Sequence, residues 1–487
     1  MSGFGIRGSG FWIRHSGFRI NVVLALLLTT LGATANAADR VWLIGGGYDL
    51  QNSQVQIEQN VLWARTVLQA LPGKRSIQTY FNDGDDPAPD VTLWQKPADV
   101  AATLQPLARV YDADYVNGEA IRSHTIAPVD GPATRQTLLD ELPQSIGRLA
   151  PGEQGLLVYA GHGSPGEHGS LLDLWGGDQF DADDLRTLIA AQPRDTTLRF
   201  IFTQCFAGGF HAALLPPAGD PQRCGFYAVA QDQFAEGCTA SLDVAEYRGY
   251  GTYFFAALAG QARTGAALSI EPDRNQDGRV DPYEAHLYTL RAARSTDVPR
   301  SSSEQYLLDW APWYFPLLRV APRADNPYAE IVQELQRDLD IASPLRDALY
   351  LRRKQAQREI AHLTGRQEQA RDRAQTAMEQ LQGEVERRWP AARSPYTLAY
   401  TQFIERDLDA AQAFIQAHTR YPDLITDQDT YWTLDNAILA LQRQLALYDR
   451  IEHLQHLARL RDVFLEKAGE AERAVYRELL ACEQRPL

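Results

Sequence analysis

A histidine and a cysteine end two strand-like segments of this 487-residue chain. The segments span residues 155–163 and 198–205, and both have the apolar, β-branched and aromatic composition of buried strands. Between them, residues 181–191 begin with acidic residues and continue with apolar residues at helical spacing, which predicts a crossover helix. A strand, a helix and a parallel strand place both carboxyl ends at one edge of a sheet. His162 and Cys205 are therefore expected to meet at that edge.

The pairing of these two residue types has a chemical reason. A free thiol is only partly ionised near neutral pH, and an adjacent imidazole can remove its proton. His162 and Cys205 are thus a candidate dyad, with Cys205 as nucleophile and His162 as base and then acid. The N–H groups of Gly163 and Cys205 are candidate donors to an oxyanion. The alternative is that both are ordinary strand-end residues, since cysteine is among the most buried residue types.

A second motif overlaps the histidine. Residues 161–166 also match the Gly-x-Gly-x-x-Gly spacing of dinucleotide-binding loops. That fingerprint requires its last glycine to open an amphipathic helix. Residues 167–177 contain several glycines and no helical stripe, so the nucleotide-binding interpretation is excluded.

These segments resemble the caspase-like cysteine peptidases, most closely the legumain branch. In that family one strand ends in His-Gly, often within His-Gly-Ser-x-Gly, and the next ends in the nucleophilic Cys followed shortly by Gly. This chain has His162-Gly-Ser-Pro-Gly166 and Gln204-Cys205-Phe-Ala-Gly208. Further ordered matches lie between residues 40 and 320, at residues 41–47, 80–86, 132–139 and 251–258.

The resemblance implies a fold and an activity. We expect an α/β peptidase domain over residues 38–322, with a caspase-like, mostly parallel sheet flanked by helices. The implied activity is that of a cysteine endopeptidase, which cleaves protein or peptide substrates through an acyl-enzyme and needs no metal for catalysis. Two alternatives stay open: an inactive caspase-like scaffold, and a transamidase that resolves the same acyl-enzyme with an amine.

The chain departs from the family pattern where specificity is set. The family has an acidic residue two positions before the nucleophile, and this chain has Thr203. Gln54 and Val55 stand where the family has a basic pair, so a pocket for asparagine is not supported. Asp232 is a candidate pocket carboxylate for a basic side chain, although acidic loop residues are more often simply solvated.

One family residue near the first strand is retained. Asn52 stands where the family carries an asparagine, which makes it a candidate to orient His162. That role depends on the resemblance and not on the spacing of the two residues.

A twelve-residue segment, residues 273–284, matches the EF-hand calcium loop. The loop has a glycine at its sixth position and an apolar residue at its eighth. Four carboxylates in so short a segment repel one another unless a cation compensates. No second loop is present to pair with it, so we expect one structural Ca²⁺ site; the alternative is an Asp-rich turn without metal. The candidate ligands are Asp273, Asn275, Asp277, Arg279 through its carbonyl, Asp281 and Glu284.

The first 37 residues have the pattern of a secretory signal: a basic start, an apolar core at residues 22–31 and Ala35-Asn-Ala37 as a cleavage site. The core is shorter than a membrane span, and no later segment qualifies, so we expect no stable span after cleavage; the alternative is an uncleaved anchor. Lysine is rare beside arginine, which hints at a bacterial genome and hence a periplasmic or secreted protein. The net charge of −15 argues against nucleic acid as a partner.

Four cysteines imply no disulfide scaffold. Cys205 must stay free if it is the nucleophile. Cys224 and Cys238 flank one predicted strand and could form a disulfide, which would leave Cys482 unpaired. Spacing alone cannot show whether two cysteines come close enough to pair.

Residues 328–487 differ in composition from the rest. They are rich in Ala, Leu, Gln, Glu and Arg, and apolar residues recur at three- and four-residue intervals, which predicts long helices. Residues 355–387 are so polar that only a narrow stripe can be buried, as in a coiled-coil arm. Two interpretations stay open: a helical bundle that packs on itself, or a lid or docking module for a protein partner.

Overall fold

The computed structural model describes residues 39–94, 104–111, 119–167, 169–215, 221–394 and 397–487. The expected signal segment, residues 1–37, lies outside these ranges. The described residues belong to one compact unit.

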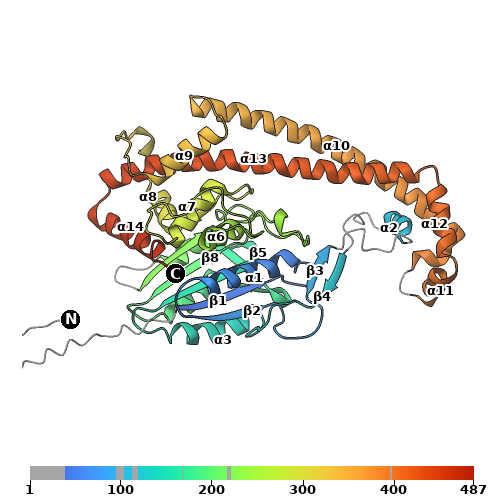
Figure 1. Ribbon diagram of the computed structural model, residues 1–487, viewed down its shortest axis with the longest axis horizontal. Helices are drawn as coiled ribbons and strands as arrows, with labels where there is room; N and C mark the ends of the chain where they lie inside the picture. Colours follow the sequence, from blue (N-terminus) through green and yellow to red (C-terminus); the bar gives the residue numbers. More distant parts are fainter. Residues whose placement is uncertain (1–38, 95–103, 112–118, 168, 216–220, 395–396) are drawn as a thin grey trace, which may run out of the picture. The chain divides into compact units, whose positions relative to one another are not determined.

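A mostly parallel sheet lies at the centre of this unit (Figure 1). Its strands follow the order β10-β9-β8-β5-β1-β2, and all neighbours pair in parallel except β10 with β9. The predicted α/β class with a helical C-terminal part is confirmed. The strands are β1 (Asp39–Gly46), β2 (Arg75–Phe81), β5 (Gln154–Gly166), β8 (Thr197–Phe202), β9 (Gln222–Tyr227) and β10 (Arg300–Ser301).

Alternating side chains of the strands build two cores, one on each face of the sheet. In β1, Val41 and Leu43 belong to one core, whereas Trp42 and Ile44 belong to the other. The first face is covered by α1 (Val55–Ala70), α6 (Tyr250–Ala259) and α7 (Pro282–Ala292). The second face is covered by α3 (Arg135–Ile146) and α4 (Ala182–Ala190).

The connection from β5 to β8 contains the predicted crossover helix. Helix α4 begins after Asp181, whose carboxylate accepts the N–H groups of Asp183 and Asp184. Before that helix, β5 turns into an antiparallel ribbon with β6 (Gly169–Leu174) and β7 (Asp178–Phe180). A strand and not a helix therefore follows Gly166, which agrees with the exclusion of dinucleotide binding.

Shorter elements decorate the sheet and its loops. Strands β3 and β4 form a separate antiparallel ribbon. These elements are β3 (Val91–Trp94), α2 (Gln105–Tyr111), β4 (Glu119–Arg122), η3 (Trp175–Gly177), η4 (Ala207–Phe210), α5 (His211–Leu214), η5 (Val244–Glu246), α8 (Ser302–Trp310) and η6 (Phe315–Leu317).

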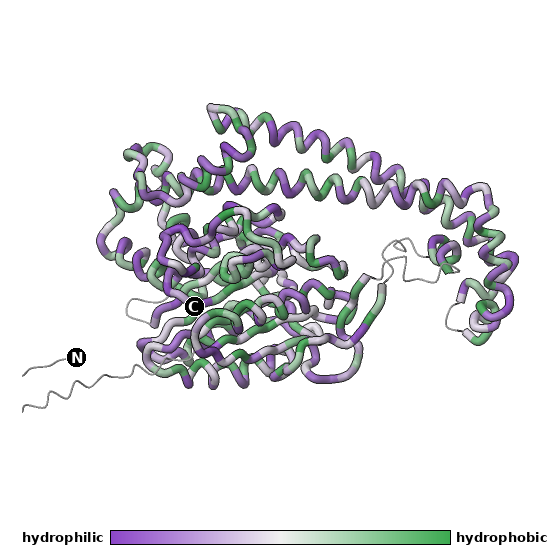
Figure 2. The backbone as a smooth tube through the Cα atoms, in the orientation of Figure 1, coloured by the Kyte–Doolittle hydropathy of each residue, from purple (hydrophilic) through white to green (hydrophobic). Residues whose placement is uncertain are grey.

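Two long helices, α10 (Leu345–Arg388) and α13 (Tyr421–Lys467), lie side by side in the C-terminal part (Figure 1). Their tubes in Figure 2 alternate between hydrophilic and hydrophobic residues along most of their length. The other C-terminal elements are α9 (Pro327–Asp338), η7 (Pro390–Arg393), α11 (Leu398–Arg406), α12 (Leu408–Ala417) and α14 (Glu470–Glu483).

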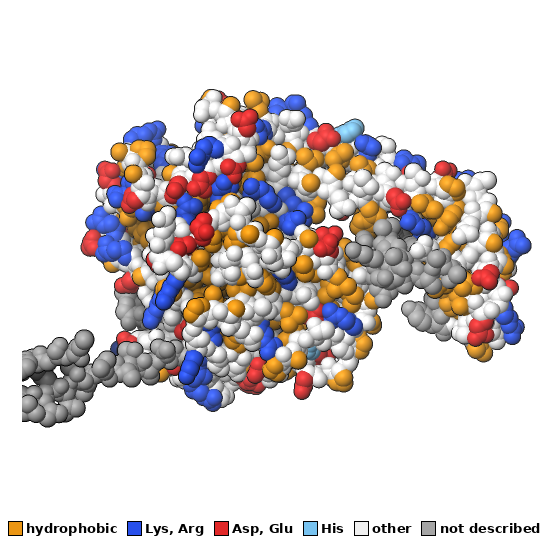
Figure 3. Space-filling model, viewed as in Figure 1, with side chains coloured by type: hydrophobic (Ala, Val, Ile, Leu, Met, Phe, Trp, Pro, Cys, Tyr) orange, Lys and Arg blue, Asp and Glu red, His pale blue; other side chains and the backbone are white. Residues whose placement is uncertain are grey.

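The buried face of α10 has the narrow stripe of a coiled coil. Its buried residues Leu349, Ala356, Leu363, Ala370 and Ala377 recur at seven-residue steps. Charged side chains of both signs are interspersed over the face of the helical part seen in Figure 3. Among the described residues, no helix combines the length and the hydropathy of a membrane span.

The C-terminal helices share buried cores with the α/β part. One cluster joins Tyr283, Leu287 and Leu290 of α7 to apolar residues of α9 and α13. The compositional boundary at residues 322–328 therefore falls inside a single packed unit.

A disulfide also ties the last helix to the sheet. Cys224 of β9 is bonded to Cys482 of α14, with Cα atoms 6.0 Å apart. The suggested Cys224–Cys238 pairing is therefore wrong, because the chain returns to the sheet at its C-terminus and brings Cys482 within reach of Cys224. The backbone carbonyls of Arg485 and Pro486 accept from the buried Arg199 guanidinium. Cys205 and Cys238 are free thiols.

We predict that this disulfide stabilises the folded chain. Replacing Cys224 and Cys482 together by serine should lower the free energy of unfolding by about 2–4 kcal/mol, since a long loop is no longer closed in the unfolded state. Denaturant unfolding monitored by circular dichroism measures the loss. A reducing agent should destabilise the parent chain and Cys238→Ser, but not the double variant; equal sensitivity of all three would contradict the prediction.

Candidate active site

His162 and Cys205 lie at matched positions beyond the last paired residues of β5 and β8. Tyr159 of β5 pairs with Phe202 of β8, and the third residue past each is His162 and Cys205, respectively. The strands are parallel, so both residues are at the carboxyl edge of the sheet. The sequence prediction that the crossover unit places them at one edge is confirmed by this register.

Gly163 brings the two chain segments into close contact. A Cβ atom at this position would lie 2.6 Å from the carbonyl oxygen of Cys205 and 2.4 Å from Cγ of Gln204. Those distances are below any ordinary contact, so a side chain cannot be accommodated without displacing the backbone that carries Cys205. The glycine after His162 is thus required by the approach of the two segments.

The His162 ring is oriented by a backbone carbonyl. Its Nε2 lies 2.8 Å from the carbonyl oxygen of Asn52 and 2.9 Å from Oε1 of Gln54. The side chain of Asn52 points elsewhere, and its Nδ2 donates to Asp49 at 2.8 Å. Asn52 therefore contacts the histidine as the family resemblance suggested, but through its main chain.

These contacts determine which nitrogen of the neutral ring carries the hydrogen. A carbonyl oxygen can only accept, so Nε2 carries the hydrogen, and the neutral ring keeps an unprotonated Nδ1. Burial lowers the pKa of His162, and the Asn52 carbonyl opposes this change only in part. A buried neutral imidazole with a free Nδ1 is the form that can accept a proton.

A buried polar network supports the loop that carries Asn52. The fully buried Asn82 accepts the N–H of Gly47 at 3.0 Å and donates to the Ser53 hydroxyl at 2.8 Å. The N–H of Thr92 donates to the Ser53 carbonyl at 2.8 Å. Because both ends of the loop are held, the Asn52 carbonyl has a fixed position relative to β5.

Among the described residues, Asp83, Asp90 and His124 are the one group of three possible metal-ligand side chains whose ligand atoms lie within 4.8 Å of one another. The Asp90 carboxylate already accepts hydrogen bonds from the Asn82 side chain, from the backbone N–H of His124 and from the His124 ring. Burial and the nearby Asp90 raise the pKa of Asp83 to about 6. We interpret the group as support for the Asn52 loop.

The sulfur of Cys205 faces a second loop. The N–H of Ala235 donates to Sγ at 3.3 Å, and the thiol is 3.7 Å from the Ala235 carbonyl. After the cysteine the chain turns sharply: Phe206 has φ of +59°, in the left-handed region that non-glycine residues rarely adopt. Its N–H donates to the Gln233 carbonyl at 2.8 Å, which holds the turn against the same loop.

Burial keeps both reactive groups neutral. It raises the pKa of the Cys205 thiol, whereas the Ala235 N–H acts in the opposite direction. The lowered pKa of His162 favours a neutral ring. Within the described part of the chain, no hydrogen bond joins the His162 ring to Cys205. Burial therefore favours a thiol and a neutral imidazole over an ion pair.

A small cavity of about 10 Å³ adjoins Cys205. Thr203, Gly251 and residues 235–238 line it, and its one carboxylate belongs to Glu236. Asp232 is exposed and does not line this cavity, so the geometry gives no support to Asp232 as the pocket carboxylate for a basic side chain.

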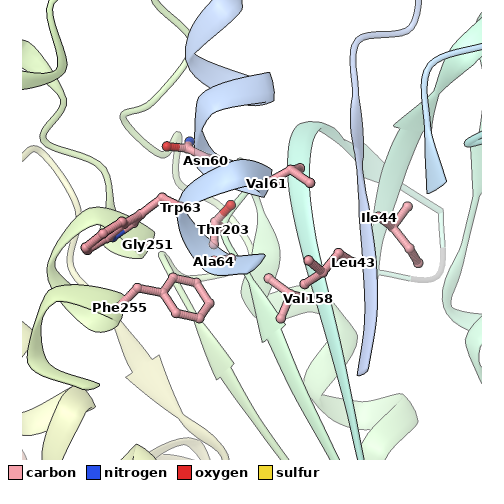
Figure 4. A pocket seen from close by; sticks show the side chains of 11 residues that line it. Leu43, Ile44, Asn60, Val61, Trp63, Ala64, Val158, Thr203, Gly251 and Phe255 are labelled. Carbon is pink, nitrogen blue, oxygen red and sulfur yellow. The ribbon is translucent and has the colours of Figure 1, made fainter. Parts of the chain in front are cut away.

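A neighbouring apolar cavity continues from Thr203 and Gly251 between α1 and α6. Figure 4 shows side chains that line it, among them Trp63 and Asn60 of α1 and Phe255 of α6. Sequence reasoning found neither cavity, because each is formed by residues from separate elements.

The predicted calcium loop adopts a tight turn directly before α7. Gly278 has φ of +84°, and its N–H donates to Oδ2 of Asp273 at 2.9 Å. Glu284 accepts the N–H groups of Arg274 and Asn275 through Oε1, at 2.9 and 3.0 Å. Burial and the nearby Glu284 raise the pKa of Asp281 to about 7. The donor set and turn fit a hard cation, although no three of the loop's carboxylates lie within 4.8 Å of one another.

Sequence reasoning missed two groups that contact the reactive side chains. Gln54 was noted only as a departure from the family, yet its amide reaches the His162 ring. Ala235 contacts the sulfur through its backbone, which no residue pattern can reveal.

Comparisons with known proteins assign no family to the chain. It matches no family model, and a search of curated proteins finds no match. Among solved structures, protein GSU0716 from Geobacter sulfurreducens is similar at 10% sequence identity, over 54% of this chain and 92% of that chain, with a TM-score of 0.32. A similarity at this level carries no argument about fold or function.

We predict that a carboxylate at position 54 raises the pKa of His162. Gln54→Glu would place a negative charge beside Nε2, which favours the imidazolium by about one pKa unit or more. An NMR titration of the imidazole C–H signals, assigned with His162→Ala, measures the change. Gln51→Glu adds the same charge on the same loop without a contact to the ring and should have a smaller effect; equal shifts would contradict the geometry.

Proposed function

We propose that the chain is an exported cysteine endopeptidase that uses Cys205 and His162 as a dyad. The observation that carries the proposal is the matched register of β5 and β8, with Gly163 packed against the Cys205 carbonyl. His162, Cys205 and the N–H groups of Gly163 and Cys205 thus lie at one edge of the sheet, which supports roles for them as base, nucleophile and oxyanion donors. The resemblance to caspase-like peptidases supports the reaction class.

The reaction begins from neutral groups. Nδ1 of His162 accepts the thiol proton as Sγ of Cys205 attacks the carbonyl carbon of the scissile bond. The oxyanion that forms is stabilised by N–H groups, for which Gly163 and Cys205 are the candidates. The imidazolium then protonates the leaving amine, and a thioester remains on Cys205. Water, deprotonated by His162, hydrolyses the thioester and restores the thiol.

The disulfide and the free thiol of the chain are both compatible with export. Disulfides persist in oxidising compartments, and Cys224 is bonded to Cys482. Cys205 remains a free thiol in the same chain, as a nucleophile must. A bacterial periplasm or the outside of the cell would satisfy both conditions.

One observation favours the alternative of an inactive scaffold. The His162 ring and the thiol do not hydrogen bond to each other in the described residues, so the dyad must close when substrate binds. In the scaffold alternative, the C-terminal helices would bind a protein partner while Cys205 stays unreactive. Labelling with a substrate-like electrophile separates these possibilities, and product analysis with an added amine separates hydrolysis from transamidation.

We predict that a peptidyl chloromethyl ketone alkylates Cys205 in the native protein. Mass spectrometry should place the label on Cys205, and Cys205→Ala should remove it. His162→Ala should slow labelling roughly a hundredfold, since the general base is lost. His418→Ala, which changes a histidine of the helical part, serves as the control and should leave the rate unchanged. Labelling of Cys205 at the same rate without His162 would refute the dyad.

The EF-hand-type loop would hold one Ca²⁺ through Asp273, Asn275, Asp277, the Arg279 carbonyl, Asp281 and Glu284. The ion would supply positive charge to a loop in which burial and a neighbouring carboxylate already raise the pKa of Asp281. The loop caps the start of α7, whose apolar residues pack against α9 and α13. The expected role is therefore structural.

We predict that millimolar Ca²⁺ raises the melting temperature by about 3 °C, because a ligand bound only by the native state stabilises it by mass action. The double variant Asp273→Ala/Asp277→Ala should lose this increase. Asp183→Ala removes an exposed carboxylate from α4 and should retain it. Differential scanning fluorimetry with and without a chelator measures the shift; an unchanged response in the double variant would exclude the loop as the site.

A further inference from the structure

Helix α13 reaches the loop that contacts the Cys205 sulfur. Arg443 of this helix binds the carboxylate of Glu236 with its guanidinium fork: Nε is 2.9 Å from Oε1 and 3.3 Å from Oε2, and Nη2 also bonds to Oε1. Both side chains are mostly buried, with 26% and 15% of their surface exposed. Glu236 follows Ala235, the residue that donates to Sγ.

Glu236 is the junction of this loop with the rest of the protein. Its N–H donates to Oδ1 of Asp297 at 2.7 Å, and its Oε2 accepts the N–H of Thr296 at 2.9 Å. The other oxygen of Asp297 accepts the N–H of Tyr250, at the start of α6, at 2.8 Å. The position of the Ala235 N–H therefore depends on a short chain of polar contacts, and Arg443 of α13 joins this chain through Glu236.

Loss of the Arg443–Glu236 ion pair should be more costly than loss of an exposed ion pair. Surface pairs contribute little, but a buried carboxylate left without its cation is costly. Asp297 is fully buried beside Glu236, and burial with this neighbour raises its pKa to about 7. Arg450 of α13 partly offsets this effect at Asp297. Without Arg443, the Glu236 carboxylate would lose the guanidinium that it binds, and we expect it to turn toward water and to move the loop.

We propose that Arg443 is a positioning residue for the nucleophile: by holding Glu236, helix α13 keeps the Ala235 N–H directed at Sγ of Cys205. A hydrogen bond to sulfur favours the thiolate. The C-terminal helices then contribute to the reactivity of the thiol. The consequence for peptide cleavage rests on the proposed function, whereas the effect on the thiol does not.

The test measures the rate of Cys205 alkylation by iodoacetamide between pH 6 and pH 10. Digestion and mass spectrometry separate Cys205 from Cys238, the other free thiol. Arg443→Ala should slow alkylation at pH 7 by about three- to tenfold and move the midpoint of the pH profile upward. Groups near the sulfur that also shape this profile are Asp173, Cys238 and Asp297, and all are unchanged in the variant.

A matched control comes from the same helical arm. Arg373 of α10 binds Asp427 of α13 with Nε at 3.0 Å and Nη2 at 2.7 Å from Oδ1. Arg373→Ala breaks an ion pair of the arm without touching the loop and should reproduce the parent profile. Glu236→Gln should behave as Arg443→Ala does, and the double variant should be no slower than either single variant, because both changes remove one interaction.

The outcomes separate the inference from the proposed function. A parent-like profile for Arg443→Ala would overturn the inference, whether or not the chain cleaves peptides. If Arg443→Ala does not fold, Arg443→Lys keeps the charge but loses the fork, and its profile must shift in the same direction for the inference to stand. Absence of peptide cleavage together with a shifted profile would refute the proposed function alone.

Discussion

The parallel pairing of β5 with β8 is the constraint on which the site depends. This pairing places His162 and Cys205 at the same level along the sheet. The segments that carry them approach so closely that position 163 must be glycine. Successive apolar side chains of each strand pack in the cores on opposite faces of the sheet. A slip of the register by one residue would therefore move each buried side chain of that strand to the other face. The stability of the cores therefore also fixes the relative position of His162 and Cys205.

The sheet alone does not determine how reactive these residues are. Burial disfavours both the imidazolium and the thiolate, and the groups that oppose burial come from loops: the Asn52 carbonyl at His162 and the Ala235 N–H at Cys205. Backbone groups have no charge to titrate, so their effect depends on position alone. This explains why each loop is anchored by buried polar residues, Asn82 on one side and Glu236 on the other.

The parts of the structure that the sequence predicts are those set by local pattern. The strands before His162 and Cys205, the helix that begins after Asp181 and the turn at Gly278 all follow from periodicity, capping residues or glycine. The parts that escape prediction join distant segments. Cys224 pairs with Cys482 because the C-terminus returns to the sheet, and Arg443 meets Glu236 because α13 packs over the loop. Spacing along the chain contains no information about either contact.

These distant contacts change how the helical part should be understood. A lid or docking module that could be removed would leave the α/β core intact, but here α7 buries Tyr283, Leu287 and Leu290 against helices from beyond residue 327. Truncation would expose that surface and break the disulfide that anchors α14. Substitutions within the packed chain are therefore the informative way to separate a structural role of the helices from a functional one. The contact between α13 and the nucleophile loop gives these helices a direct physical connection to the proposed active site.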